Sequence, residues 1–199
     1  LTHLNLQDNQ LSGTIPPELG GLSKLRRLYL CDNWLTGSIP SELGDLTDLI
    51  QLYLHANQLS GSIPSELQNL TNLEAGELFL NRNALYTTDD ALRMFLNSKQ
   101  NGGDWESSQT VAPTNLTPGT PTVTSVSPTW RPITYTGDTG GYEVYYATAS
   151  GGPYTLFKTT ADKNATGIIV TDLSPNTAYY FRVRSKTDPH ANNQNTVYS

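Results

Sequence analysis

Two acidic residues are the first candidates for chemistry in this sequence. Asp8 and Asp32 occupy the same position in successive copies of a repeated pattern, and in stacked coils their carboxylates would lie about 5 Å apart. Carboxylates at that separation can share acid–base work or bind Ca²⁺. Because Ala56 and Arg82 continue the same position, no third carboxylate joins them. We therefore expect two solvated acids and no metal site.

The histidines and the single cysteine give no stronger signal. His3 and His55 fall at different strand positions of the repeat, without a matching set of ligands nearby, so we expect solvated strand residues. Cys31 is the only cysteine, and its position in the repeat predicts an exposed thiol. The sequence has no Gly-x-Ser-x-Gly, His-Glu-x-x-His or phosphate-loop motif, which are the short signatures of common catalytic sites. We expect no catalytic residues, no enzymatic activity and no cofactor.

A repeat organises the first part of the chain and must position all of these residues. The pattern Leu-x-x-Leu-x-Leu-x-x-Asn-x-Leu-x-Gly-x-Ile-Pro starts at Leu1, Leu25 and Leu49. A fixed period of 24 residues indicates a stacked solenoid. The closely spaced leucines alternate with polar or aromatic residues, as in a strand that is buried on one face. One copy cannot bury these leucines alone, so neighbouring copies must stack.

An asparagine follows each of these strands, at Asn9, Asn33 and Asn57. An amide side chain both donates and accepts hydrogen bonds, so it can satisfy backbone groups that a turn leaves unpaired in adjacent coils. We expect a structural role for these three residues.

The repeated pattern resembles leucine-rich repeats, and its Gly-x-Ile-Pro part resembles the 24-residue subtype best known from plant receptors. This resemblance implies an α/β solenoid with a parallel sheet on its concave face. A fourth copy begins at Leu73, with Ala75 and Gly76 as a small insertion before its strand.

A short helix should follow the repeats. Thr87-Thr88-Asp89-Asp90 offers N-cap side chains and early acids before the apolar residues of 91–96, which is a helix-start signal. This helix and the later pair Asp104-Trp105 resemble the closing cap of bacterial repeat proteins. We therefore expect leucine-rich repeats with a helical C-terminal cap over 1–105, and a polar linker over 106–112.

The remaining residues, 113–199, have the composition and turn signals of an all-β domain. Leu173-Ser-Pro175-Asn-Thr177-Ala-Tyr179 resembles the corner motif of fibronectin type III domains, with Trp130 in the second strand and Tyr142-x-Val144-x-Tyr146 in the third. The resemblance implies a β-sandwich in which Trp130 and Tyr179 are structural residues. Its last strand, Thr196–Ser199, is short, so we expect a truncated strand there. The expected core residues are Trp130, Tyr142, Val144, Ile169, Leu173, Tyr179, Phe181 and Val183.

An aromatic column is the candidate binding feature of the repeats. The residue between the paired leucines is Asn5 and then Tyr29, Tyr53 and Phe79, which would point outward in file from the concave sheet. Aromatic residues suit strands and stabilise one another across a ladder, but rigid aromatics bordered by charges also suit an interface. Both interpretations stay open. On the second, the ligand-binding residues are Tyr29, Tyr53, Phe79, Arg27, Gln51, His55 and Asp32.

The amino-acid composition limits which classes of partner the protein can bind. A formal net charge of −6 with 15% charged residues argues against a nucleic-acid surface, which needs clustered Lys and Arg. No apolar run approaches the ~18 residues of a membrane-spanning helix. Leu1 opens in the middle of a solenoid pattern, so we expect a fragment of a bacterial secreted or cell-surface protein.

Two hypotheses for the function remain. The first is an extracellular or cell-surface recognition module that binds a protein or peptide through the concave face, with the second domain as a spacer. The alternative is an accessory, carbohydrate-binding region of a larger secreted enzyme, for which the partner would be a glycan. A flanking catalytic motif or a membrane anchor in the full reading frame would distinguish them.

Overall fold

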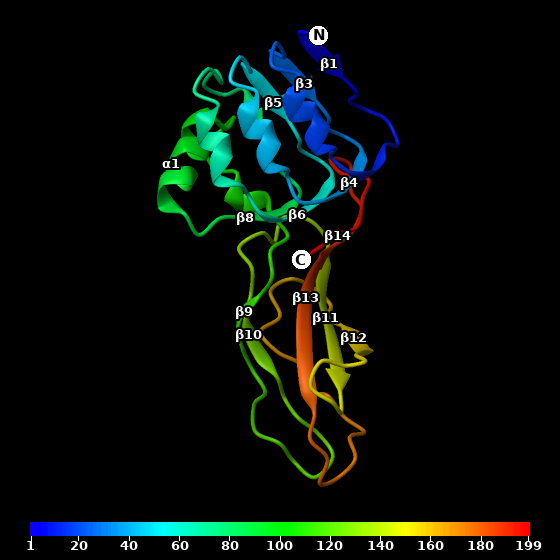
Figure 1. Cartoon of the computed structure of the whole chain (residues 1–199). Coiled ribbons are helices and arrows are strands. Elements are labelled where there is room, and N and C mark those ends of the chain that lie inside the picture. Colours follow the sequence, from blue (N-terminus) through cyan, green and yellow to red (C-terminus); the bar gives the residue numbers. More distant parts are fainter. The chain divides into compact units, whose positions relative to one another are not determined.

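The computed structural model describes all residues from 1 to 199 and divides them into two compact units (Figure 1). The first unit holds Leu1–Gln109 together with Pro189–Val197. The second holds Thr110–Asp188 together with Tyr198–Ser199. The composition of the sequence predicts a single boundary within 106–112, whereas in the structure a C-terminal segment also returns to the first unit.

Parallel strands of successive coils form the first sheet, as the repeat predicts. Its strands, in the order β1-β3-β5-β7, are β1 (His3–Asn5), β3 (Arg27–Tyr29), β5 (Gln51–Tyr53) and β7 (Leu78–Phe79). Leu28 lies opposite Leu4 and Leu52, and Leu52 lies opposite Leu78. The last step is two residues longer than the others, so the register absorbs the insertion at Ala75 and Gly76. The coils lie side by side from blue to green in Figure 1.

A second parallel sheet follows the asparagine turns, and a 3₁₀ helix follows each Ile-Pro step. The strands, in the order β2-β4-β6-β8, are β2 (Ser12–Thr14), β4 (Trp34–Gly37), β6 (Gln58–Ser62) and β8 (Ala84–Tyr86). The 3₁₀ helices are η1 (Pro17–Gly21), η2 (Ser41–Asp45) and η3 (Ser65–Asn69). A Cβ atom on Gly20 would lie 2.3 Å from the carbonyl oxygen of Glu42. Glycine at this position therefore lets adjacent 3₁₀ helices approach closely.

One hydrophobic core runs through the whole first unit. The repeated leucines of the strands, such as Leu28, Leu52 and Leu78, are fully buried in it. Helix α1 (Asp90–Lys99) lies against η3 and adds Leu92 and Leu96 to the same core. Trp105 is also buried there.

The start of α1 agrees with the signal in the sequence. The Asp89 side chain accepts hydrogen bonds from the backbone N–H groups of Ala91 and Leu92, so it is the N-cap. Arg93 forms an ion pair with Glu106 in the short helix η4 (Glu106–Ser108). Residues 106–109 are therefore ordered against the repeats, in contrast to the polar linker that the sequence predicts. No helix of the chain is long and apolar enough to cross a bilayer.

The second unit is built from antiparallel strands. β9 (Thr114–Thr117) pairs with β10 (Thr129–Arg131). The larger sheet, in the order β12-β11-β13-β14, holds β11 (Gly140–Ala147), β12 (Thr155–Thr159), β13 (Tyr180–Thr187) and the short β14 (Val197–Tyr198), of which Tyr198 belongs to this unit. The core residues are Trp130, Ile133, Tyr135, Tyr142, Val144, Val170 and Leu173, with Tyr179, Phe181 and Val183 partly buried against them.

One expected core residue of this unit lies on the surface. Ile169 is 61% exposed, whereas Val170 is fully buried. Val170 pairs with Val126 in an antiparallel bridge, and successive side chains of an extended chain point to opposite faces. The inward residues are therefore Ile168 and Val170, and the assignment of Ile169 to the core was wrong.

Tyr179 makes the hydrogen bond that defines a tyrosine corner. Its hydroxyl accepts a hydrogen bond of 2.9 Å from the backbone N–H of Ser174. Tyr179 is partly buried while the next residue, Tyr180, is 41% exposed, which is the alternation that the sequence predicts.

Candidate functional site

The predicted aromatic column lies on the first parallel sheet. Tyr29, Tyr53 and Phe79 are paired partners on β3, β5 and β7, and each side chain is half-buried. The rings of Tyr29 and Tyr53 stack with centroids 4.5 Å apart and an interplanar angle of 18°. The rings of Tyr53 and Phe79 meet edge to face at 4.6 Å. The three rings therefore form one continuous aromatic surface across neighbouring coils.

A polar network holds the two tyrosines from one side. The Tyr29 hydroxyl donates a hydrogen bond to Gln51. Gln51 donates to Glu77 at 2.8 Å, and the Tyr53 hydroxyl donates to the same Glu77 oxygen at 2.5 Å. Burial, and then the Glu77 carboxylate, raise the pKa of Tyr53 well above its ordinary value. Arg27, the other predicted residue on this side, contacts the imidazole of His3.

The other side of the column differs from the sequence-based expectation. Cys31 is 3% exposed, so the predicted exposed thiol is buried. Burial, with a further contribution from the neighbouring Asp32, raises the pKa of Cys31 to about 12. The coil stack covers this position because the next coil places the imidazole of His55 beside it. The thiol, the Asp32 carboxylate and the His55 imidazole offer donor atoms within 4.8 Å of one another.

His55 is also not the freely solvated strand residue that the sequence suggests. Its ring centroid lies 5.5 Å from that of Phe79 and 6.2 Å from that of Tyr53. Its Nε2 atom lies 3.5 Å from an Asp32 carboxylate oxygen. Burial lowers the pKa of His55, and Arg82 acts in the same direction, while Asp32 and Asp8 oppose the shift.

The asparagine positions form a ladder of hydrogen bonds through the coils. Asn57 accepts from the backbone N–H of Leu35 at 3.0 Å and donates to the carbonyl oxygens of Leu30, Leu54 and His55 at 3.0–3.2 Å. Asn33 and Asn83 make equivalent contacts one coil away on either side, whereas Asn9 donates only within its own coil. These are the backbone contacts that a structural role of the amides requires.

A C-terminal segment that the sequence pattern assigns to the second domain covers the edge of this ladder. Asn193 donates to the carbonyl oxygens of Asn57 and Arg82 at 3.1 and 3.0 Å. Asn195 donates to the carbonyl oxygen of Asn33 at 2.7 Å. Both amides are buried. The only sequence signal for this contact is the amide-rich run Asn192–Asn195, which has no hydrophobic periodicity.

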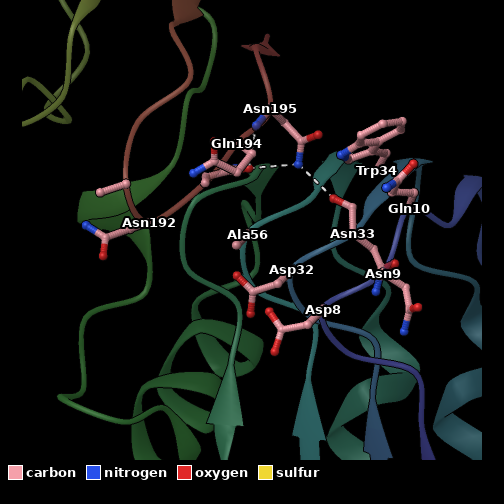
Figure 2. Close-up of a pocket in the computed structure, with 12 residues that line it drawn as sticks. Asp8, Asn9, Gln10, Asp32, Asn33, Trp34, Ala56, Asn192, Gln194 and Asn195 are labelled. Carbon is pink, nitrogen blue, oxygen red and sulfur yellow. Dashed lines mark hydrogen bonds between the residues drawn. The ribbon is translucent and has the colours of Figure 1, made fainter.

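A pocket of about 380 Å³ lies beside these contacts (Figure 2). Asp8 and Asp32 of successive coils line it together with Ala56, and the returning segment supplies residues from Ala191 to Asn195. Figure 2 shows the carboxylates of Asp8 and Asp32 extending toward the same side. The two acids of the repeat therefore open onto one pocket.

Comparisons with known proteins agree with both halves of the fold. A family model described as Leucine Rich Repeat matches residues 1–22, 24–46 and 48–70. A model described as Fibronectin type III domain matches residues 107–197. No curated protein sequence matches the chain.

Solved structures resemble part of the chain. The plant peptide hormone receptor RGFR1 in complex with RGF2 is 40% identical over 50% of this chain and 16% of its own, with a TM-score of 0.45. The BIR2 ectodomain from Arabidopsis thaliana is 34% identical over 47% of this chain and 48% of its own, with a TM-score of 0.44. A plant ice-binding protein is 40% identical over 43% of this chain and 27% of its own, with a TM-score of 0.40. The chain thus spans less than half the length of these proteins, and it contains leucine-rich repeats followed by a fibronectin type III domain.

Proposed function

We propose that this chain is a non-enzymatic recognition module that binds a protein or peptide through the outer face of the sheet β1-β3-β5-β7. The observation that carries the proposal is the continuous aromatic surface of Tyr29, Tyr53 and Phe79. Aromatic side chains are enriched among the residues that dominate interface energies, and they cluster where a polar rim surrounds them. Arg27, Gln51, His55 and Asp32 border the rings and form that rim.

The aromatic side chains are already held in fixed positions in the unbound protein. Gln51 and Glu77 fix both tyrosine hydroxyls, while the ring stack limits rotation of the side chains. Binding to an already ordered side chain avoids an entropic cost of about 0.5–1.5 kcal/mol for each immobilised group. This pre-organisation favours a recognition role over strand packing alone, because strand packing does not require the outer hydroxyls to be anchored.

The finer features of the proposal rest on the sequence. We infer a secreted or cell-surface setting, a bacterial source and the 24-residue plant-type repeat. The repeats end in a cap that consists of α1 with Trp105, and the fibronectin type III domain serves as a spacer. The apolar face of α1 supports the cap, since Leu92 and Leu96 close the core of the last coil.

The test begins with a displayed library of random peptides, selected on the full chain. Tyr53→Ala should weaken the selected peptides by about thirtyfold or more, equivalent to about 2 kcal/mol, because the central aromatic anchor is lost. The substitution also removes the Glu77 hydrogen bond and three ring contacts, so some loss of stability is expected. Tyr53→Phe keeps the ring, and it should retain affinity within a few-fold. Calorimetric titration gives both affinities, and circular dichroism verifies the fold of each variant.

A control on the other surface of the coils makes the test specific. Thr14, Ser38 and Ser62 are exposed polar residues of the Gly-x-Ile-Pro side, and their triple substitution by Ala should leave affinity unchanged. If the triple substitution abolishes binding while Tyr53→Ala has no effect, the aromatic column is only strand packing. Selection of glycans in place of peptides would support the accessory-region alternative.

A further inference from the structure

Three side chains with metal-binding chemistry converge beside the aromatic column. The Cys31 sulfur, an Asp32 carboxylate oxygen and a His55 ring nitrogen all lie within 4.8 Å of one another. No sequence motif predicts this group, because its three residues come from two different coils. The recognition role of the aromatic surface neither requires nor excludes a second role for these three residues.

The repeat itself brings these residues together. Cys31 and His55 occupy the same position in successive coils, and each is the second residue after its strand, β3 or β5. The backbone N–H of Asp32 donates to the carbonyl oxygen of His55 at 3.2 Å, which fixes the two coils at this point. Asp32 has a left-handed backbone conformation, with φ of 54°, so its side chain leaves the strand direction and lies next to the imidazole. The geometry is therefore set by backbone bonds rather than by the side chains alone.

The surroundings of these groups favour a cation. His55 Nδ1 is inaccessible to solvent and has no hydrogen-bond partner, although buried polar atoms are nearly always paired. The Cys31 thiol is buried within the electrostatic range of two acids, Asp32 and Asp8, rather than in a purely apolar environment. A cation at this point would neutralise the acidic surroundings, and the imidazole already presents Nε2 to an Asp32 carboxylate oxygen at 3.5 Å.

The donor set selects the class of metal. Thiolate, imidazole and carboxylate ligands together suit Zn²⁺, whereas Ca²⁺ and Mg²⁺ prefer oxygen ligands only. Zinc bonds of about 2.0–2.3 Å place tetrahedral donors roughly 3.3–3.6 Å apart. The most widely separated donor atoms, which lie within 4.8 Å of one another, therefore need to move closer by up to about 1.5 Å. We propose that Cys31, Asp32 and His55 form a zinc site, beside the pocket that Asp8 and Asp32 line.

Access and charge support the site. Asp8 and Asp32 line the pocket shown in Figure 2, which gives a metal ion a route from solvent. Asp8 acts electrostatically on both Cys31 and His55, so it lies within range of the bound cation. Arg82 is the opposing positive group near His55. Zinc binds the thiolate, so the thiol proton is released to solvent as the Zn–S bond forms.

The experiment uses the reduced full chain after treatment with a chelator. Titration with Zn²⁺ against a chromophoric competitor should show one site per chain, and saturation should raise the melting temperature, because the metal links two coils. Titration with Co²⁺ should give a sulfur-to-cobalt charge-transfer band together with the visible bands of a tetrahedral ion. Cys31→Ser should abolish the charge-transfer band, and His55→Gln and Asp32→Asn should each weaken zinc affinity at least tenfold.

A matched control separates this site from incidental metal binding. His3→Gln removes a histidine of the same sheet that lies two coils away from His55, and it should leave zinc affinity unchanged. The circular dichroism spectra of all apo variants establish that each one folds. Absence of zinc binding at micromolar metal, or equal affinity in the wild type and all three ligand variants, would overturn the proposal.

Discussion

Lys163 is the most unusual single residue of the second unit. It is 2% exposed, and its ammonium lies 4.3 Å from the centroid of the Tyr135 ring, with no hydrogen-bond partner. Burial lowers the pKa of Lys163 to about 8, against the opposing effect of Asp138 and Asp188. The aromatic ring replaces only part of the lost hydration.

This lysine makes the stability of the second unit depend on pH. Between pH about 8 and about 10.5 the unfolded state binds more protons than the folded state, so the free energy of unfolding should rise with pH. Below pH about 8 the penalty is present in full. Lys163→Met should therefore raise the free energy of unfolding at pH 7 by about 1–2 kcal/mol and flatten the pH dependence. Urea denaturation at pH 7, 9 and 10 measures both effects. The exposed Lys158→Met is the control, and equal slopes for Lys163→Met and the wild type would contradict the explanation.

Tyr179 carries a second prediction at the level of a single side chain. Tyr179→Phe removes the hydroxyl that accepts from Ser174, and it should lower the free energy of unfolding by about 0.5–1.5 kcal/mol without changing the fold. Tyr180→Phe alters an exposed hydroxyl and should be nearly neutral. Thermal denaturation of the two variants compares them directly. Equal losses would mean that the corner hydrogen bond contributes nothing specific.

At the scale of secondary-structure elements, glutamines end the asparagine ladder. Gln109 accepts from the backbone N–H of Leu85 at 3.0 Å and donates to the carbonyl oxygen of Leu80 at 2.9 Å. These contacts reproduce those of Asn83 one coil earlier. Gln100 similarly accepts from the backbone N–H of Leu80. The residues after α1 therefore satisfy the polar backbone of the last coil, where no further repeat follows.

Loss of the Gln109 hydrogen bonds should lower the stability of the repeats. Gln109→Ala leaves the buried backbone N–H of Leu85 without its side-chain acceptor, while the Leu80 carbonyl keeps the hydrogen bond from Asn83. The repeats should therefore lose about 1–3 kcal/mol of stability. Gln68→Ala, on the surface of η3, is the matched control and should change stability by less than about 0.5 kcal/mol. Chemical denaturation, with hydrogen exchange of the amides in 80–86 as a local probe, measures the effect. Unchanged exchange at Leu85 would show that water replaces the glutamine.

At the scale of the whole molecule, the chain returns to its first unit. Pro189–Val197 follows the second unit in sequence but belongs to the repeats. Asn193 and Asn195 bind carbonyl oxygens of Asn33, Asn57 and Arg82, which lie 111–162 residues earlier in the chain. The hydrogen-bonding groups at the turns of three coils thus depend on residues from the far end of the sequence.

The returning segment should therefore stabilise the repeats rather than the sandwich. Asn193→Ala with Asn195→Ala leaves three carbonyl groups without these donors, and we expect the first unit to lose about 1–3 kcal/mol of stability. Hydrogen-exchange mass spectrometry should show faster exchange in the peptides that contain residues 30–36 and 54–60. The exposed neighbour Asn192→Ala should leave the exchange unchanged. Faster exchange only in the second unit would show that the segment supports the sandwich instead.

The sequence determined those features that it encodes locally or repeatedly. The 24-residue period predicts both the buried leucines and the file of Tyr29, Tyr53 and Phe79, because stacking identical coils places equal positions side by side. The N-cap at Asp89 and the corner at Tyr179 arise from contacts between residues close in sequence. The contacts of Gln109 were not predicted, because an asparagine makes the equivalent hydrogen bonds in the preceding coils.

Only the tertiary structure decided the remaining features. Cys31, Asp32 and His55 meet because coil stacking closes the gap between them, but their residue types form no repeated pattern. The binding of Asn193 and Asn195 to the repeats could not be predicted from the sequence either. A backbone carbonyl group accepts a hydrogen bond from any amide, so the residue types do not specify which amide will be its partner. The outward orientation of the Ile169 side chain follows from the pairing of Val170 with Val126, which directs Val170 into the core. Long-range contacts that do not recur with a period produce no pattern in a single sequence, so they can be identified only from the folded structure.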